Sequence, residues 1–195
     1  MRRMTALVLA ALATMFAAGC SSADDNGGPA AGPADGSFLA AYGLSGLDAR
    51  GAIDRLERTP VADRSKVLKA SVRPDQLQLT DTRTGATTAL EIPAGLFYLS
   101  VAPYVDQTHE CFFHSLTTCR GELTGQDLQV RITDTATGKV LVDGAAKTYE
   151  NGFTGFWLPS GITAKLQVTH DGRTATADIA TTADAPTCLT TLRLT

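Results

Sequence analysis

The fold is decided by the stretch Leu166-Gln167-Val168-Thr169-His170-Asp171-Gly172-Arg173-Thr174-Ala175-Thr176-Ala177-Asp178-Ile179. Apolar residues alternate with polar residues on both sides of its Asp-Gly pair, and a period of two is typical of a β-strand with one buried face. An Asp-Gly pair between two such runs favours a two-residue hairpin turn. The stretch therefore predicts two antiparallel strands joined by a tight turn.

The same period of two recurs from Val72 onward. Turn residues at 82–85 and 134–138 separate further alternating runs, so each of these turns predicts another hairpin. Near the C-terminus, Leu192 and Leu194 continue a face shared with Cys188. The alternating apolar residues are Leu77, Leu79, Leu90, Ile92, Phe97, Leu99, Val101, Val130, Ile132, Val140 and Val142.

Two helices are predicted before these strands. The stretch Ser45-Gly46-Leu47-Asp48 fits a capping box, and the apolar residues after it have helical spacing, so a helix should run to about Arg58. Thr59-Pro60 supplies an N-cap and a first-turn proline for a shorter helix ending near Ala70. The predicted fold class is α+β: a short N-terminal helical segment followed by a mostly antiparallel, sandwich-like β domain.

The first twenty residues predict export and lipidation. Arg2 and Arg3 precede the apolar run 6–18, and small residues lead into Gly19-Cys20, as in a bacterial lipoprotein signal peptide. The match departs from the usual pattern at Ala17, where leucine is common. The apolar run is shorter than the roughly 20 residues that a bilayer span needs. We expect residues 1–19 to be removed and Cys20 to anchor the protein in the cell envelope; the alternative is a secreted protein cut nearby.

The rest of the chain divides into a tether and two folded segments. Residues 20–37 are rich in Gly, Pro, Ala, Asp and Ser, a composition typical of a flexible linker. Residues 38–92 hold the predicted helices and the first β-hairpin, and we expect a homodimer contact there. Residues 93–195 form the β domain that carries the cysteines.

Charge and motifs exclude several classes of protein. Of the 17 basic side chains, Arg2 and Arg3 are lost with residues 1–19, which leaves 15 basic against 20 acidic ones. A net charge of −5 gives no electrostatic footprint for nucleic acid. The sequence has no nucleophile elbow, phosphate loop or HExxH motif, so a hydrolase is not indicated. All three methionines lie within residues 1–19, so a copper site in the mature chain would have no thioether ligand.

Three cysteines remain in the mature chain after Cys20: Cys111, Cys119 and Cys188. Thiolates in an exported protein either pair as disulfides or hold a soft metal such as Cu(I) or zinc. An odd number allows at most one internal bridge and leaves a thiol. Fully extended, the segment would hold Cys111 and Cys119 about 26 Å apart, so either use requires it to fold back.

Two interpretations of the cysteines stay open at this point. In the structural one, a Cys111–Cys119 bridge closes a loop and Cys188 is buried as a small apolar residue. In the functional one, a distant strand brings Cys188 to the other two and the three form a metal site. His109 and His114 flank Cys111 and are candidate ligands or partners of ligands, whereas His170 precedes a hairpin tip and is not expected to bind metal.

Six strings surround the three cysteines: 97–105, 107–109, 111–122, 151–153, 157–159 and 186–192. These strings closely resemble the CueP family of bacterial copper-resistance proteins, and the similarity covers residues 46–195. The resemblance implies a periplasmic or envelope copper-binding protein whose three cysteines hold Cu(I) and take part in thiol-linked reduction of Cu(II). It also implies delivery of copper to a client such as a copper-zinc superoxide dismutase, and a shape related to dimeric disulfide isomerases.

The main hypothesis is thus a lipid-anchored protein that sequesters and transfers Cu(I), held by Cys111, Cys119 and Cys188, with zinc as a competing metal. It is a metal-binding chaperone rather than an enzyme, apart from cupric reduction by its thiols. One alternative is a thiol-disulfide oxidoreductase or isomerase that uses Cys111 and Cys119. The other is a structural lipoprotein with one disulfide.

Overall fold

The computed structural model describes residues 36–195. The predicted signal peptide, the lipidation site Cys20 and most of the tether lie outside the described residues. The tether was expected to end at residue 37, but helix α1 already begins at Gly36. Within residues 36–195, no helix has both the length and the apolar character needed to cross a bilayer.

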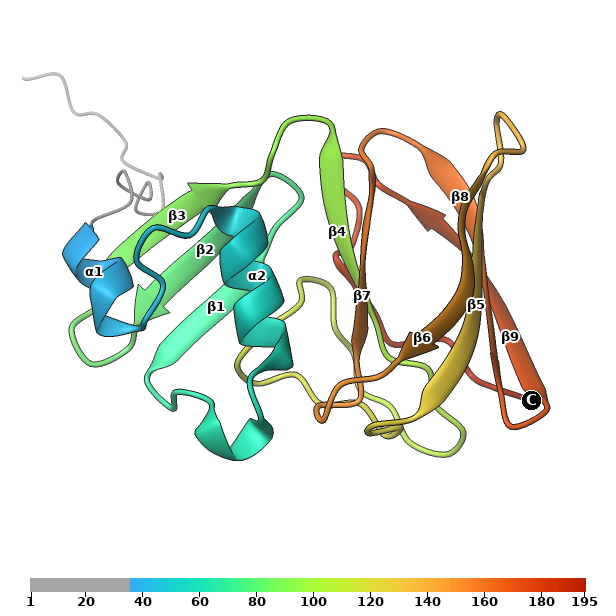
Figure 1. Ribbon diagram of the computed structural model, residues 1–195, viewed down its shortest axis with the longest axis horizontal. Coiled ribbons are helices and arrows are strands. Elements are labelled where there is room, and N and C mark those ends of the chain that lie inside the picture. Colours follow the sequence, from blue (N-terminus) through green and yellow to red (C-terminus); the bar gives the residue numbers. More distant parts are fainter. Residues whose placement is uncertain (1–35) are drawn as a thin grey trace, which may run out of the picture. The chain divides into compact units, whose positions relative to one another are not determined.

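In the described residues, two α-helices and one short 3-10 helix precede ten strands (Figure 1). The helices are α1 (Gly36–Ala41), α2 (Ala49–Arg58) and the 3-10 helix η1 (Val61–Asp63). The strands are β1 (Leu68–Val72), β2 (Gln76–Asp81), β3 (Thr87–Glu91), β4 (Leu96–Val101), β5 (Asp127–Asp134), β6 (Val140–Lys147), β7 (Thr154–Pro159), β8 (Thr163–His170), β9 (Arg173–Ala180) and β10 (Cys188–Leu189).

The strands form three sheets, with the orders β1-β2-β3, β10-β4-β7 and β6-β5-β8-β9. All pairings within them are antiparallel except that of β10 with β4, which is parallel. Helix α2 covers one face of the β1-β2-β3 sheet (Figure 1). The predicted α+β class with a mostly antiparallel, sandwich-like domain is confirmed.

The predicted hairpin around Asp171-Gly172 is β8-β9. Asp171 and Gly172 have φ angles of 49° and 78°, and His170 pairs with Arg173 across the turn. Positive φ at both central residues is the geometry of a type I′ turn, whose twist matches that of the flanking strands. Asp and Gly tolerate this conformation, so the local sequence is sufficient to specify the turn.

Helix α2 ends at Arg58, as expected, but its N-cap is Asp48 and not Ser45. The Asp48 side chain accepts a hydrogen bond of 2.8 Å from the backbone N–H of Gly51. The helix buries Ala49, Ile53 and Glu57, which lie four residues apart on one face. A carboxylate therefore lies on the apolar face of this helix.

The second predicted helix, from Pro60 to about Ala70, is wrong. The chain there forms only the three-residue η1, and from Leu68 it becomes β1, which pairs with β2 over five residues. The proposed helix had only Val61 and Leu68 on its apolar face, too little burial to hold a helix against tertiary pairing. As a strand, the same segment buries Leu68, Ala70 and Val72 on one side.

Strand β4 faces two hydrophobic cores. Phe97, Leu99 and Val101 belong to the core of the four-stranded sheet, whereas Tyr98 belongs to the core beneath α2. Alternate residues of a strand point to opposite faces, so Ser100 lies on the same side as Tyr98. This alternation aims two hydroxyl groups at α2. The division of the folded chain into the segments 38–92 and 93–195 stays a prediction.

Candidate metal centre

The connection between β4 and β5, residues 102–126, carries Cys111, His114 and Cys119. It is fastened to the edge of β1: the His114 carbonyl accepts a hydrogen bond from the Val72 N–H at 2.9 Å, and the Leu116 N–H donates to the Ala70 carbonyl at 2.9 Å. These backbone bonds fix the position of His114, whose side chain is 0% exposed.

A tight turn folds Cys119 back toward Cys111, as a shared use of the two cysteines requires. The Cys119 N–H donates to the Ser115 carbonyl at 3.1 Å, and the Thr118 hydroxyl donates to the Ser115 hydroxyl at 2.7 Å. The Ser115 N–H in turn points at the Cys119 sulfur, 3.3 Å away. The sulfurs of Cys111 and Cys119 end 3.6 Å apart.

Cys188 reaches the same place from β10. The Phe112 carbonyl accepts hydrogen bonds from the N–H groups of both Thr187 and Cys188, at 3.0 and 3.2 Å, which sets Cys188 beside the neighbouring Cys111. These two cysteines form a disulfide with their Cα atoms 5.7 Å apart, and Cys119 keeps a free thiol. The alternative Cys111–Cys119 bridge is therefore wrong for this state, because the hydrogen bonds to the Phe112 carbonyl hold Cys188, and not Cys119, within bonding distance of Cys111.

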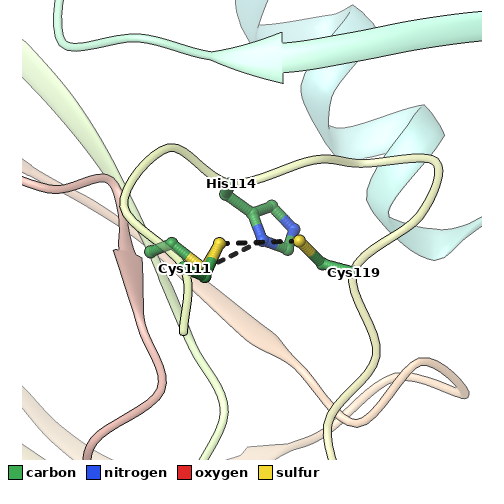
Figure 2. Close-up of side chains that lie close together, drawn as sticks. Cys111, His114 and Cys119 are labelled. Carbon is green, nitrogen blue, oxygen red and sulfur yellow. Dashed lines mark hydrogen bonds between the residues drawn. A yellow bond between two sulfur atoms is a disulfide. The ribbon is translucent and has the colours of Figure 1, made fainter. Parts of the chain in front are cut away.

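Three sulfurs and one imidazole nitrogen converge on a small volume. The ligand atoms of Cys111, His114, Cys119 and Cys188 all lie within 4.8 Å of one another. Cys188 and His114 are buried, whereas Cys111 and Cys119 are half-buried. Figure 2 shows the sulfurs of Cys111 and Cys119 pointing toward each other beside the His114 ring. Two buried apolar residues, Ala102 and Phe153, pack against the cysteines.

The buried carboxylate of Glu57 contacts the His114 ring on the side away from Cys188. His114 Nε2 lies 3.0 Å from an oxygen of Glu57, and Nδ1 lies 3.6 Å from the Cys188 sulfur. Glu57 is 1% exposed and also accepts hydrogen bonds from the Asn151 amide at 2.8 Å, the Tyr98 hydroxyl at 3.1 Å and the Ser100 hydroxyl at 3.2 Å. Four donors from three segments, two of them on β4, therefore satisfy one carboxylate from α2.

These contacts set the charges of the pair. Burial raises the pKa of Glu57, but the charge of His114 and hydrogen bonds from His114, Asn151 and Tyr98 outweigh it, so the pKa lies below its usual value. Burial lowers the pKa of His114, but the charge of Glu57 and hydrogen bonds to Cys119 and Glu57 raise it overall, to about 9. The pair is therefore ionic in the metal-free protein at neutral pH.

His109 and His170 lie outside this group of ligand atoms. The ring of His109 packs edge-on against Phe153, with centroids 6.2 Å apart, and its Nε2 is buried without a hydrogen-bond partner. It lines an open cleft of about 460 Å³ with Gln107, Thr108, Arg120, Gly121 and Glu122. His170 lies at the β8-β9 turn, with Nδ1 2.9 Å from the Asp127 carbonyl. Of the two histidines that flank Cys111, only His114 meets the sulfurs.

Glu57, Asn151, Tyr98 and Ser100 were not selected as site residues from the sequence. Glu57 did leave a signal, since it repeats the four-residue spacing of Ala49 and Ile53 on the apolar face of α2. A carboxylate in such a position must find partners, because burying an unpaired charge is very unfavourable. The identity of those partners depends on the fold.

Glu122 fastens the start of the cysteine loop. Its carboxylate accepts hydrogen bonds from the N–H groups of Val105, Asp106 and Gln107, the shortest 2.8 Å from Val105. Burial raises the pKa of Glu122, but the three hydrogen bonds lower it by more. The pKa of Glu122 therefore lies below its ordinary value of 4.5.

Glu122→Gln is expected to lower the free energy of unfolding at pH 7 by about 1 kcal/mol, because a charged acceptor becomes neutral. A lowered folded-state pKa means that this contribution is complete above pH 4.5 and is lost as the pH falls through the lower folded value. Urea denaturation of both proteins between pH 3 and pH 7 should show two curves that converge at the acid end. A pH-independent difference would contradict this assignment.

Comparison with known proteins agrees with this geometry. A family model described as "Periplasmic copper-binding protein CueP" matches residues 51–193. The chain belongs to the CueP family. A solved structure, "Crystal Structure of S.CueP", is 37% identical, with a TM-score of 0.77, and the match covers 85% of this chain and 100% of that chain. No curated protein matches the chain.

Membership of the CueP family confirms the predicted resemblance, and with it export to the envelope and copper as the bound metal. The group of three sulfurs and one imidazole nitrogen fits that metal, since thiolates and imidazole are copper ligands. Lipid anchoring, the oxidation state of the copper and the individual ligands stay predictions.

Proposed function

We propose that this CueP protein sequesters Cu(I) between the thiolates of Cys111, Cys119 and Cys188. The observation that supports this is the convergence of three sulfurs within 4.8 Å of one another and of His114. Cu(I) is soft and prefers sulfur, and the partly apolar surroundings limit competition from water. Zinc, which accepts the same ligands, is the competing metal.

The disulfide makes this site redox-dependent. With Cys111 and Cys188 joined, only the Cys119 thiolate and His114 remain as donors, so tight binding requires the disulfide to be reduced first. The same cysteines supply electrons for reduction of Cu(II): two thiolates lose one electron each to two Cu(II) ions, which become two Cu(I), and the two sulfurs then join. A reductant must restore the thiolates before the site can hold Cu(I) again.

The exposure of the cysteines suits transfer to a client. Cys111 and Cys119 are half-buried, whereas Cys188 and His114 are buried, so an incoming ligand would reach the copper from the loop side. We propose that a copper-requiring envelope protein, such as a copper-zinc superoxide dismutase, receives the metal there. Cys20 would anchor the donor to the membrane, and segment 38–92 would supply a homodimer contact.

The decisive experiment compares the two redox states of one protein. We would titrate the mature chain carrying Cys20→Ser with Cu(I), anaerobically, against a chromophoric chelator, before and after reduction of the disulfide. The reduced protein is expected to hold one copper and compete with the chelator, and the oxidised protein to compete at least about 100-fold less well, because two of three thiolates are lost.

Thiol counts under denaturing conditions provide the control, with one thiol expected in the oxidised chain and three in the reduced chain. Equal competition by both forms would contradict the three-cysteine site. If neither form competed, thiol-disulfide exchange would become the better assignment. That second candidate is favoured by the 3.6 Å between Cys119 and Cys111, because a Cys119 thiolate there could attack the bonded Cys111 sulfur and release Cys188.

A further inference from the structure

Helix α2 contributes to the metal centre through a residue that cannot touch the metal. Glu57 lies on the side of the His114 ring opposite the sulfurs, contacting Nε2 while Nδ1 lies near Cys188. It comes from a helix 57 residues before His114 in the chain. Its other partners hold the carboxylate on both oxygens: Asn151 on Oε1, and Tyr98 and Ser100 on Oε2.

The chemistry of this arrangement decides which ring nitrogen faces the sulfurs. An ionised carboxylate only accepts hydrogen bonds, so the His114 nitrogen next to it must carry a proton. Nε2 is therefore occupied by its N–H donated to Glu57. Nδ1 is the nitrogen left to meet either a thiolate or a metal, at 3.6 Å from the Cys188 sulfur.

We infer that Glu57 is the positioning residue of the metal centre: it holds the Nε2–H of His114 so that Nδ1 is presented to Cys111, Cys119 and Cys188. The inference rests on the proposed Cu(I) site. In metal sites a carboxylate on the outer nitrogen of a histidine fixes the ring orientation and its protonation state, and loss of such a partner typically weakens metal binding about 10–100-fold.

A purely structural role for Glu57 is the competing explanation, and the same helix offers a matched control. Asp54 also joins α2 to the sheet that carries β4, since it accepts a hydrogen bond of 3.2 Å from the Trp157 indole N–H, but it is not among the partners of His114. Asp54→Asn removes a charge from the same helix and the same side of the fold. Glu57→Gln removes a charge that the His114 ring contacts.

The first test needs no metal. ¹H–¹⁵N correlation spectra of the reduced, metal-free protein with labelled histidines are expected to show His114 protonated at Nε2 in the wild type and in Asp54→Asn. In Glu57→Gln the counter-ion is gone and the new amide can donate to Nε2, so His114 is expected to lose the Nε2 proton and keep only the proton on Nδ1. A wild-type His114 that carries its proton on Nδ1 and none on Nε2 would overturn the inference even if every variant failed to fold.

The second test measures Cu(I) affinity by chelator competition. Glu57→Gln is expected to bind about 10–100-fold more weakly than the wild type, and Asp54→Asn to stay within about 2-fold. Glu57→Asp keeps an acceptor-only carboxylate and is expected to bind more tightly than Glu57→Gln. Packing alone predicts the reverse order, because glutamine has the same shape as glutamate and aspartate is shorter.

A double-mutant cycle shows whether Glu57 acts through His114. His114→Gln keeps an amide donor for Glu57 but lacks Nδ1, so adding Glu57→Gln to it is expected to change Cu(I) affinity by less than about 2-fold. Full additivity would contradict action through the ring. Wild-type affinity in Glu57→Gln would overturn this inference alone, whereas no copper binding by the wild type would refute the proposed function.

Discussion

Replacing Cys188 with serine is expected to weaken Cu(I) binding by more than about 100-fold. Cys188 is 2% exposed and supplies the most buried of the three sulfurs. Loss of a residue that only supports a metal ligand typically weakens binding about 10–100-fold, so removal of a ligand itself should have a larger effect. The hydroxyl of serine is a hard, weak donor for Cu(I). Competition titration of the reduced variant against the wild type measures the loss.

The controls separate lost ligation from lost packing. Cys188→Ala removes the sulfur without burying a hydroxyl and should show the same loss of affinity. Ala185→Ser places a hydroxyl at another buried position of the same segment, keeps all three thiols, and should bind copper as the wild type does. A Cys188→Ser protein that folds and retains wild-type affinity would remove Cys188 from the site.

Glu57→Ala is expected to lower the free energy of unfolding by about 3–5 kcal/mol. The change leaves the charged ring of His114 buried without its counter-ion, and it removes the acceptor of Asn151, Tyr98 and Ser100. Groups of this kind are destabilising when buried unpaired, and a domain of this size has only about 5–15 kcal/mol in total. Urea denaturation of the oxidised protein measures the change.

Asp54→Ala is the matched variant on the same helix, and it should lose only about 1 kcal/mol because it removes one partly buried hydrogen bond. Removing His114 as well, in Glu57→Ala/His114→Leu, should cost less than the two single changes together, because the uncompensated charge is gone. If Glu57→Ala and Asp54→Ala lowered the free energy of unfolding equally, the Glu57 network would contribute no more to stability than the single Asp54–Trp157 hydrogen bond.

The strands and their turns were largely predictable from the sequence. The hairpins β2-β3, β5-β6 and β8-β9 lie where the period of two and the turn residues placed them. The helix predicted over residues 60–70 was wrong, because its few apolar residues gave a weak helical pattern and residues 68–72 instead pair with β2. Local signals do not reveal whether a distant strand will claim a segment, so this error concerned tertiary pairing rather than propensity.

The sequence by itself determined the residue types of the site. Three thiols without methionine in an exported chain supply soft donors for either a disulfide or a metal, and the strings around them indicated the family and, through it, copper. Glu57 repeats the spacing of Ala49 and Ile53, but this signal was not used to predict a site residue. Each of these conclusions depends on residue identity or on spacing within one helix or strand.

Only the tertiary structure decided which of these residues meet. The parallel pairing of β10 with β4 and the hydrogen bonds from β10 to the Phe112 carbonyl place Cys188 beside Cys111, 77 residues away, and Cys119 keeps a free thiol. The fastening of the cysteine loop to β1 turns His114 toward α2 and Glu57. The physical reason is range: turn and helix signals act over a few residues, whereas a site assembled from a helix, a loop and a distant strand depends on how the sheets register and pack.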